Sequence, residues 1–396
     1  MKVIFLLLTL SGLIYSSGLG NLELGGYIEN KTSLTIAEEE SFTAIATLRL
    51  EGSWKFGKMG GVETNVIISA ALNQFDMSTI YKKSSVMERV FYDLISTPFS
   101  MALLSYTSNP ENLILDRALL KLYFKWCDFY IGRQMIAWGT GYAFNPTDIW
   151  NIKNPIDAEA PKTGVNALRM EIPFGSVSGL SIVFSPGKNF DNSSAGFRLK
   201  GNIGGYDLSM CGMSIINEEK AFLGIHRKLM AGADLAGQIG DVGIWTEGAA
   251  INPIINHGEF NNFDSIYAQI DAGLDYTFKN GLYVMVEYYY NGLGQVSYKK
   301  YSSSDFFNIV GGEMAGFAQN YIMGGFRKDL FDKFMLTVFG LGNLNDYSVL
   351  ILPSVEYDFN DNISMNLSGR IGAGKKERSE YGSLNSSVTV TFTGYF

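Results

Sequence analysis

Hydrophobic and polar residues alternate along this chain with a period of two, in segments of about ten residues. In the segment 266–278, Ile270 and Leu274 fall on one face, and Gln269 and Asp271 fall on the other. Because successive side chains of a β-strand point to opposite faces, each such segment predicts a strand with one apolar and one polar face. Both a soluble β-sandwich and a membrane β-barrel contain strands of this kind.

The positions of the aromatic residues distinguish these two folds. On the apolar face they gather where strands meet short turns, at Trp54, Phe56, Phe124, Tyr206, Tyr276, Phe278, Phe334, Tyr357, Phe359 and Phe396. Outward aromatics at one level form the interfacial girdle of a lipid-embedded barrel, whereas a soluble domain has no reason to place them at one height. We therefore expect an all-β fold, a transmembrane antiparallel up-and-down β-barrel.

The same pattern gives about eighteen candidate strands, with sixteen as the alternative. They are expected near residues 22–30, 43–56, 61–73, 114–125, 128–139, 164–173, 177–186, 194–203, 206–215, 222–237, 241–250, 265–278, 282–292, 317–327, 333–342, 347–359, 362–373 and 384–396. Short turns and longer loops alternate, and every short turn falls on the side of both chain ends. This arrangement is typical of outer-membrane barrels, which have short periplasmic turns and longer external loops.

Both ends of the sequence predict export to the cell outer membrane. Lys2, the apolar run 3–15 and the small residues 16–18 form a signal-peptide pattern, so we expect a signal peptide at 1–20 and a barrel domain at 21–396. The apolar run is shorter than the ~20 residues of a membrane helix. The last strand ends at Phe396 and resembles the C-terminal signal that the bacterial outer-membrane assembly machinery reads, although Gly394 replaces a larger residue. We expect this machinery and the membrane lipid to be partners.

Composition argues against several classes of function. The formal net charge of -8 provides no basic stripe for nucleic acid. With only Cys127 and Cys211, the chain has neither a disulfide scaffold nor a cysteine metal site. His226 and His257 lie far apart, without metal-ligand neighbours or a serine and carboxylate constellation. We expect no enzyme activity, no cofactor and no metal.

One segment carries a resemblance to a known family. The segment 131–139, in the expected strand 128–139, contains Gly132-Arg133-Gln134 and ends in Trp138-Gly139, and the loop after it contains Asn-Pro-Thr-Asp at 145–148. The chain resembles, in this motif and in its terminal Phe, a family of largely uncharacterised porin-like outer-membrane proteins. The resemblance implies a porin-type barrel without a settled substrate or catalytic residues. Adjacent Arg133 and Gln134 cannot both point inward in a regular strand, and which one does is left open.

Two long connections are candidates for controlling passage. The loop 140–163 holds turn-forming residues that fold it into a compact shape, and we expect it either to constrict the barrel from inside or to form an external cap. Its candidate residues are Asn145, Pro146, Asp148, Asn154, Pro155 and Asp157. In the connection 74–113, Ser85 and Glu88 form a capping box before a helical apolar pattern. That helix is expected to pack on the loops or to plug the mouth.

Charges on the polar faces divide between the two halves of the chain. Earlier strands carry a predicted basic wall, made of Arg49, Arg117, Lys121, Arg169, Arg198 and Lys200. Later strands carry a predicted acidic wall, made of Glu247, Asp271, Asp275, Glu287 and Glu356. Facing each other across a lumen, these walls would tune selectivity for charged or dipolar solutes. The alternative is that the charges pair with strand neighbours and only stabilise the wall.

These features favour a channel for passive or weakly selective diffusion of small hydrophilic solutes, because barrels of 16 to 18 strands leave an aqueous lumen. The alternative is a barrel closed by its loops, with a structural or surface-interaction role. An energy-coupled transporter is disfavoured, because those barrels have about 22 strands and a plug. The solute, the oligomeric state and the openness of the pore are left open.

Overall fold

The computed structural model describes residues 22–36, 41–71, 111–150, 162, 164–188, 190–216, 227–254, 266–310, 314–376 and 378–396. Their strands form one 18-stranded antiparallel sheet. The strands are β1 (Leu22–Ile36), β2 (Ser41–Lys55), β3 (Gly60–Ala71), β4 (Glu111–Tyr123), β5 (Asp128–Gln134), β6 (Val165–Pro173), β7 (Gly179–Ser185), β8 (Ser194–Ile203), β9 (Tyr206–Ile215), β10 (Arg227–Ile239), β11 (Val242–Ile254), β12 (Tyr267–Thr277), β13 (Tyr283–Asn291), β14 (Asn320–Phe331), β15 (Phe334–Asn343), β16 (Ser348–Asn360), β17 (Ile363–Ala373) and β18 (Ser386–Tyr395). Short helical segments lie between strands, at η3 (Phe190–Asn192), η6 (Tyr298–Lys300), α4 (Ser303–Val310) and η7 (Tyr381–Ser383).

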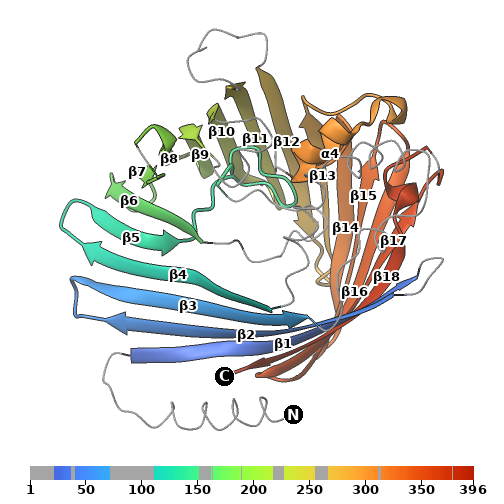
Figure 1. Ribbon diagram of the computed structural model, residues 1–396, viewed down its shortest axis with the longest axis horizontal. Coiled ribbons are helices and arrows are strands. Elements are labelled where there is room, and N and C mark those ends of the chain that lie inside the picture. Colours follow the sequence, from blue (N-terminus) through green and yellow to red (C-terminus); the bar gives the residue numbers. More distant parts are fainter. Residues whose placement is uncertain are drawn as a thin grey trace.

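Pairing between the first and last strands closes the sheet into a barrel (Figure 1). Each strand pairs with its neighbours in the chain, and β1 pairs with both β2 and β18. Phe396 extends the seam, because its carbonyl accepts a hydrogen bond from Gly26 N at 3.0 Å and its amide donates to Gly26 O at 3.1 Å. The all-β, up-and-down antiparallel barrel is therefore confirmed, with eighteen strands rather than sixteen.

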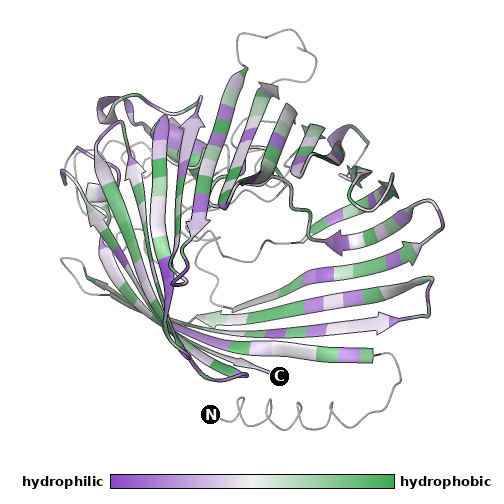
Figure 2. Ribbon diagram, turned by 180° about the vertical axis from the view of Figure 1, so that it is seen from behind, coloured by the Kyte–Doolittle hydropathy of each residue, from purple (hydrophilic) through white to green (hydrophobic). Residues whose placement is uncertain are grey.

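Hydrophilic and hydrophobic residues alternate along many of the strands (Figure 2), and their exposures show that alternate residues face the outside and the inside of the barrel. On β12, the outward Ile270 and Leu274 are each 46% exposed, whereas the inward Asp271 is fully buried. On β13, outward Val286 is exposed and inward Glu287 is buried. The apolar face expected from the sequence is thus the outer surface of the barrel, which fits lipid contact.

Outward aromatic residues form contacts at the short-turn end of the barrel. The rings of Trp54 and Phe56 lie with centroids 5.6 Å apart, and those of Tyr276 and Phe278 lie 4.8 Å apart. Farther along the chain, the ring centroid of Phe334 lies 4.6 Å from that of Tyr357, and the ring centroid of Tyr357 lies 4.8 Å from that of Phe359. These contacts fit a girdle at one membrane interface.

Several strand boundaries differ from those expected, three of them by five residues or more. β1 continues to Ile36 rather than residue 30, β10 begins at Arg227 rather than 222, and β5 ends at Gln134 rather than 139. β5 ends early because Gly132 has a left-handed backbone (φ 119°) and the buried Gln134 amide donates to the carbonyls of Tyr130 and Ala167. The Gln134 side chain thus supplies hydrogen-bond donors to strand carbonyls close to the point where the chain leaves the sheet.

Several expectations fall on residues that the structure does not describe. They are the signal peptide at 1–20, the capping box at Ser85 and Glu88, and the two histidines, His226 and His257. Within the described ranges, no helix has both the length and the apolar content required to cross a membrane.

Candidate functional site

Residues 135–150 leave the sheet after β5 and pack against the inner wall of the barrel. At the start of this segment, Ile136 and Trp138 are buried against inward residues of β6 to β12, including Val183 and Met213. Farther on, Phe144 stacks on Tyr289 of β13, with ring centroids 4.2 Å apart and planes 4° apart. The segment therefore lies inside the barrel and follows the wall from β6 to β14.

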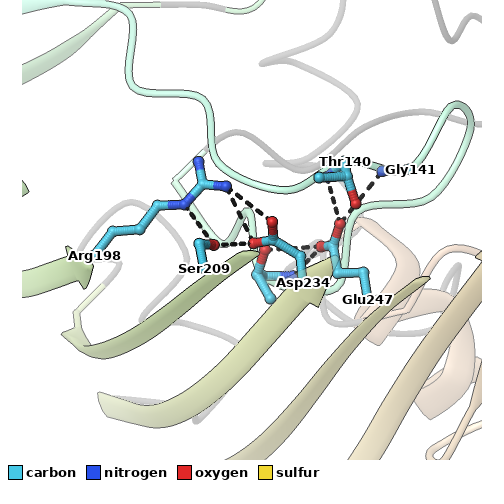
Figure 3. Close-up of polar contacts among 7 residues, drawn as sticks. Thr140, Gly141, Arg198, Ser209, Asp234 and Glu247 are labelled. Atoms are coloured by element: carbon cyan, nitrogen blue, oxygen red, sulfur yellow. Dashed lines mark hydrogen bonds and ion pairs between the residues drawn. The ribbon is translucent and has the colours of Figure 1, made fainter. Parts of the chain in front are cut away.

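A carboxylate of β11 holds the middle of this segment. Glu247 accepts hydrogen bonds from the backbone amides of Thr140 at 2.7 Å, Gly141 at 3.3 Å and Thr147 at 2.6 Å. The Thr147 hydroxyl also donates to it, at 2.8 Å. Figure 3 shows Thr140 and Gly141 lying over Glu247. With the carboxylate 1% exposed, the loop covers Glu247 completely on the lumen side.

A second carboxylate, on β13, holds the residues that follow. Glu287 accepts from the backbone amides of Tyr142 at 2.6 Å, Ala143 at 2.8 Å and Phe144 at 2.9 Å. The Trp245 indole donates to it as well, at 3.0 Å. Charge-assisted hydrogen bonds to backbone amides are among the stronger ones in proteins. We call Glu247 and Glu287 the loop clasp.

The residues of the GRQ…WG…NPxD motif shape this loop. Gly139 has φ 92°, and a Cβ there would lie 2.6 Å from a Glu247 carboxylate oxygen, so only glycine fits beneath the clasp. Asp148 N donates to Asn145 O at 3.0 Å, which closes a turn, and the fully buried Asp148 side chain forms an ion pair with Lys162. Pro146 lies buried in this turn. Of the six candidate constriction residues, Asn154, Pro155 and Asp157 lie outside the described residues.

The predicted basic residues form ion pairs with carboxylates on the same side of the barrel. Arg49, which is 5% exposed, contacts Glu51 at 2.6 Å and Asp116 at 3.4 Å, and Arg117 contacts Asp116 at 3.6 Å. The remaining pairs are Lys121 with Glu63, Arg169 with Glu171 at 3.6 Å, and Arg198 with Asp234 at 3.1 Å (Figure 3). Lys200 is exposed. Much of the positive charge on this side is thus offset locally.

The predicted acidic residues divide into two groups. Glu247, Asp271 and Glu287 are buried on the adjacent strands β11, β12 and β13, and Asp271 is directly opposite Glu247 in the sheet. Asp275 is half-buried and accepts a hydrogen bond from the Tyr283 hydroxyl at 3.1 Å, and Glu356 is half-buried on β16. The first group lies beneath the loop, so Asp275 and Glu356 are the acidic candidates that lie outside it.

No protein-family model and no curated protein matches this sequence. Solved structures do match along nearly the whole chain. OccAB4 and OccAB2 of Acinetobacter baumannii align with TM-scores of 0.59 and 0.57 at 9% and 6% identity, covering 95% of this chain and 98% of theirs. OccK8 (OprE) of Pseudomonas aeruginosa aligns with a TM-score of 0.56 at 8% identity and the same coverage. The likeness shows the fold. It assigns neither a solute nor a residue role to this chain.

Proposed function

We propose that this chain is a porin-like channel of the cell outer membrane, which lets small hydrophilic solutes diffuse with weak selectivity. The closed barrel of eighteen strands supports this proposal, because barrels of that size leave an aqueous lumen. An apolar outer face and a charged inner face support it too. No energy coupling or chemical step is needed for such passage.

The observation that carries the proposal is the loop clasp. A loop fixed inside the barrel by two carboxylates narrows the lumen at a constant place and leaves the opposite wall for solutes. That wall includes the inward faces of β17, β18 and β1, with Ser368, Thr389 and Ser33 among their residues. Single-channel conductance in a planar bilayer tests the proposal.

Selectivity should respond to single members of an ion pair in the lumen. Lys121→Gln leaves the partly exposed Glu63 without its cation, so cation preference should rise; Glu63→Gln leaves Lys121 without its anion, so anion preference should rise. The measurement is the reversal potential across a salt gradient. Both shifts should shrink between 0.1 M and 1 M salt, because the Debye length falls from ~10 Å to ~3 Å. Shifts in the same direction, or none, would place the filter elsewhere.

Topology in the membrane follows from the turn lengths. Epitope tags inserted at 57–60 or at 279–281, in the short turns, should be reached only from the periplasm. A tag beside Ser303, in the long β13–β14 connection, should be labelled on intact cells. Immunofluorescence before and after outer-membrane permeabilisation distinguishes the two sites. Labelling of both short turns on intact cells would reverse the proposed orientation.

A further inference from the structure

A buried polar cluster joins three connections at the loop end of the barrel. Glu380, in the β17–β18 connection, accepts from the Tyr321 hydroxyl and from Asn343 Nδ2, each at 2.7 Å. Its own amide donates at 2.7 Å to Asp346, in the β15–β16 connection. Tyr301, in the β13–β14 connection, donates to Asp346 at 3.1 Å. We call these five residues the outer latch.

The two carboxylates of the outer latch are both buried. Glu380 is 7% exposed and Asp346 is 9% exposed, and Asn343 Nδ2 donates to both of them, at 2.7 Å and 3.1 Å. In the part of the chain that the structure describes, the titratable groups facing Glu380 are Asp346, Tyr301, Tyr321 and the neighbouring Tyr381. Two carboxylates that share one donor repel each other when both are ionised, so the cluster disfavours double ionisation.

Tyr321 connects the outer latch to the loop inside the barrel. Its hydroxyl donates to Glu380, and its ring lies 6.1 Å from the ring of Phe144. Phe144 is held by the clasp residue Glu287 and stacks on Tyr289. A displacement of Tyr321 would therefore act directly on the segment that narrows the lumen.

We propose that the outer latch is a proton-sensitive gate, which fastens the outer connections and the constriction loop when Glu380 is protonated and releases them when Glu380 ionises. The inference rests on the proposed channel function for its effect on solute passage. The latch itself is a property of the loops and can be measured without conduction.

The direction of the response follows from the raised pKa of Glu380. Burial, and then the nearby Asp346 carboxylate, raise the pKa of Glu380 to about 7, against hydrogen bonds from Tyr321 and Asn343 that lower it. The released state exposes Glu380 to water and returns its pKa to the ordinary 4.5. The latched state thus binds the Glu380 proton more tightly than the released state does. The proton stabilises the latched state fully below pH 4.5, and this stabilisation is lost as the pH rises to about 7. The latching equilibrium should change by up to about 100-fold over this window.

Hydrogen exchange measures the latch directly. Amide protection factors of segment 378–385, corrected for the intrinsic pH dependence of exchange, should be high at about pH 5 and fall at about pH 8. Glu380→Gln, which mimics the protonated side chain, should keep the protection high at both values. Asp329→Asn, at an exposed carboxylate near the short-turn end of β14, should behave like the native chain. Equal native protection at both pH values, or a Glu380→Gln protein that still responds, would overturn the latch.

Conductance measures whether the latch reaches the pore. The native channel should conduct more at about pH 8 than at about pH 5. The conductance of the Glu380→Gln channel should be the same at both pH values. Tyr321→Phe keeps the ring beside Phe144 but removes the hydroxyl, so its conductance should also lose the pH response. A pH-independent native conductance beside a pH-dependent exchange would overturn the coupling to the pore. Absence of conductance at every pH would overturn the channel proposal, and exchange alone would then decide the latch.

Discussion

A variant with both Glu247→Ala and Glu287→Ala is expected to conduct severalfold more current than the native chain. Each change leaves three backbone amides of the loop without their acceptor. A buried donor without a partner costs about 1–3 kcal/mol, so the loop cannot keep its place against the wall. The strands keep their own hydrogen bonds, and the barrel should therefore stay folded while its lumen widens.

The matched control removes the same charge away from the loop. Asp275→Ala with Glu356→Ala also deletes two inward carboxylates; Asp275 accepts a hydrogen bond from the Tyr283 hydroxyl of β13, and Glu356 lies on β16. This control should shift the reversal potential with little change in conductance. If both double variants conduct like the native chain, the clasped loop does not set the width of the pore.

Adjacent residues of β17 should respond in opposite ways to the same substitution. Leu367 faces outward and is 45% exposed, whereas Ser368 is half-buried and faces inward. Leu367→Arg should lower the free energy of unfolding by about 2–4 kcal/mol at the membrane midplane, because the guanidinium group would lie in hydrocarbon. Ser368→Arg places the same group in the lumen and should cost much less.

Urea unfolding of the barrel in lipid vesicles measures both variants against the native chain. The pair is informative because the two positions share one strand, one depth and one backbone environment. Similar losses for Leu367→Arg and Ser368→Arg would indicate that both faces are buried in protein, as in a soluble sandwich.

Strand number and facing could be predicted because both depend on local sequence. A period of two marks the two faces of a strand, and Ile270 and Leu274 show it without any knowledge of distant residues. Boundaries were less predictable where side chains end a strand. Gln134 closes β5 by bonding to carbonyls of Tyr130 and Ala167, and that contact depends on the neighbouring strand.

The loop clasp could not be predicted because it depends on where a loop reaches in space. In the sequence, Glu247 and Glu287 are ordinary polar-face charges, indistinguishable from Asp275 or Glu356. The ion pair between Arg49 and Asp116 could not be predicted either, because it depends on how two strands pair. The register between β3 and β4 shifts beside Asn65, which moves Asp116 out of simple alternation.

The burial of apolar residues inside the barrel could not be predicted from the alternating pattern either. Met285, Tyr289 and Tyr321 lie on inward faces, which periodicity assigns to a polar lumen, yet they are 1–4% exposed. They form a cluster with Phe144 of the loop, so their environment is set by a segment far away in the chain. One sequence signal could have indicated an internal loop: several strands carry apolar residues at positions that face inward.

Single-channel recording of the purified native protein in a planar bilayer tests whether the barrel is an open channel. We expect discrete current steps at neutral pH, with a conductance that increases in the Glu247→Ala, Glu287→Ala variant. Insertion of folded barrels without any current, for the native chain and for this variant alike, would contradict the channel and favour a closed barrel with a structural or surface-interaction role.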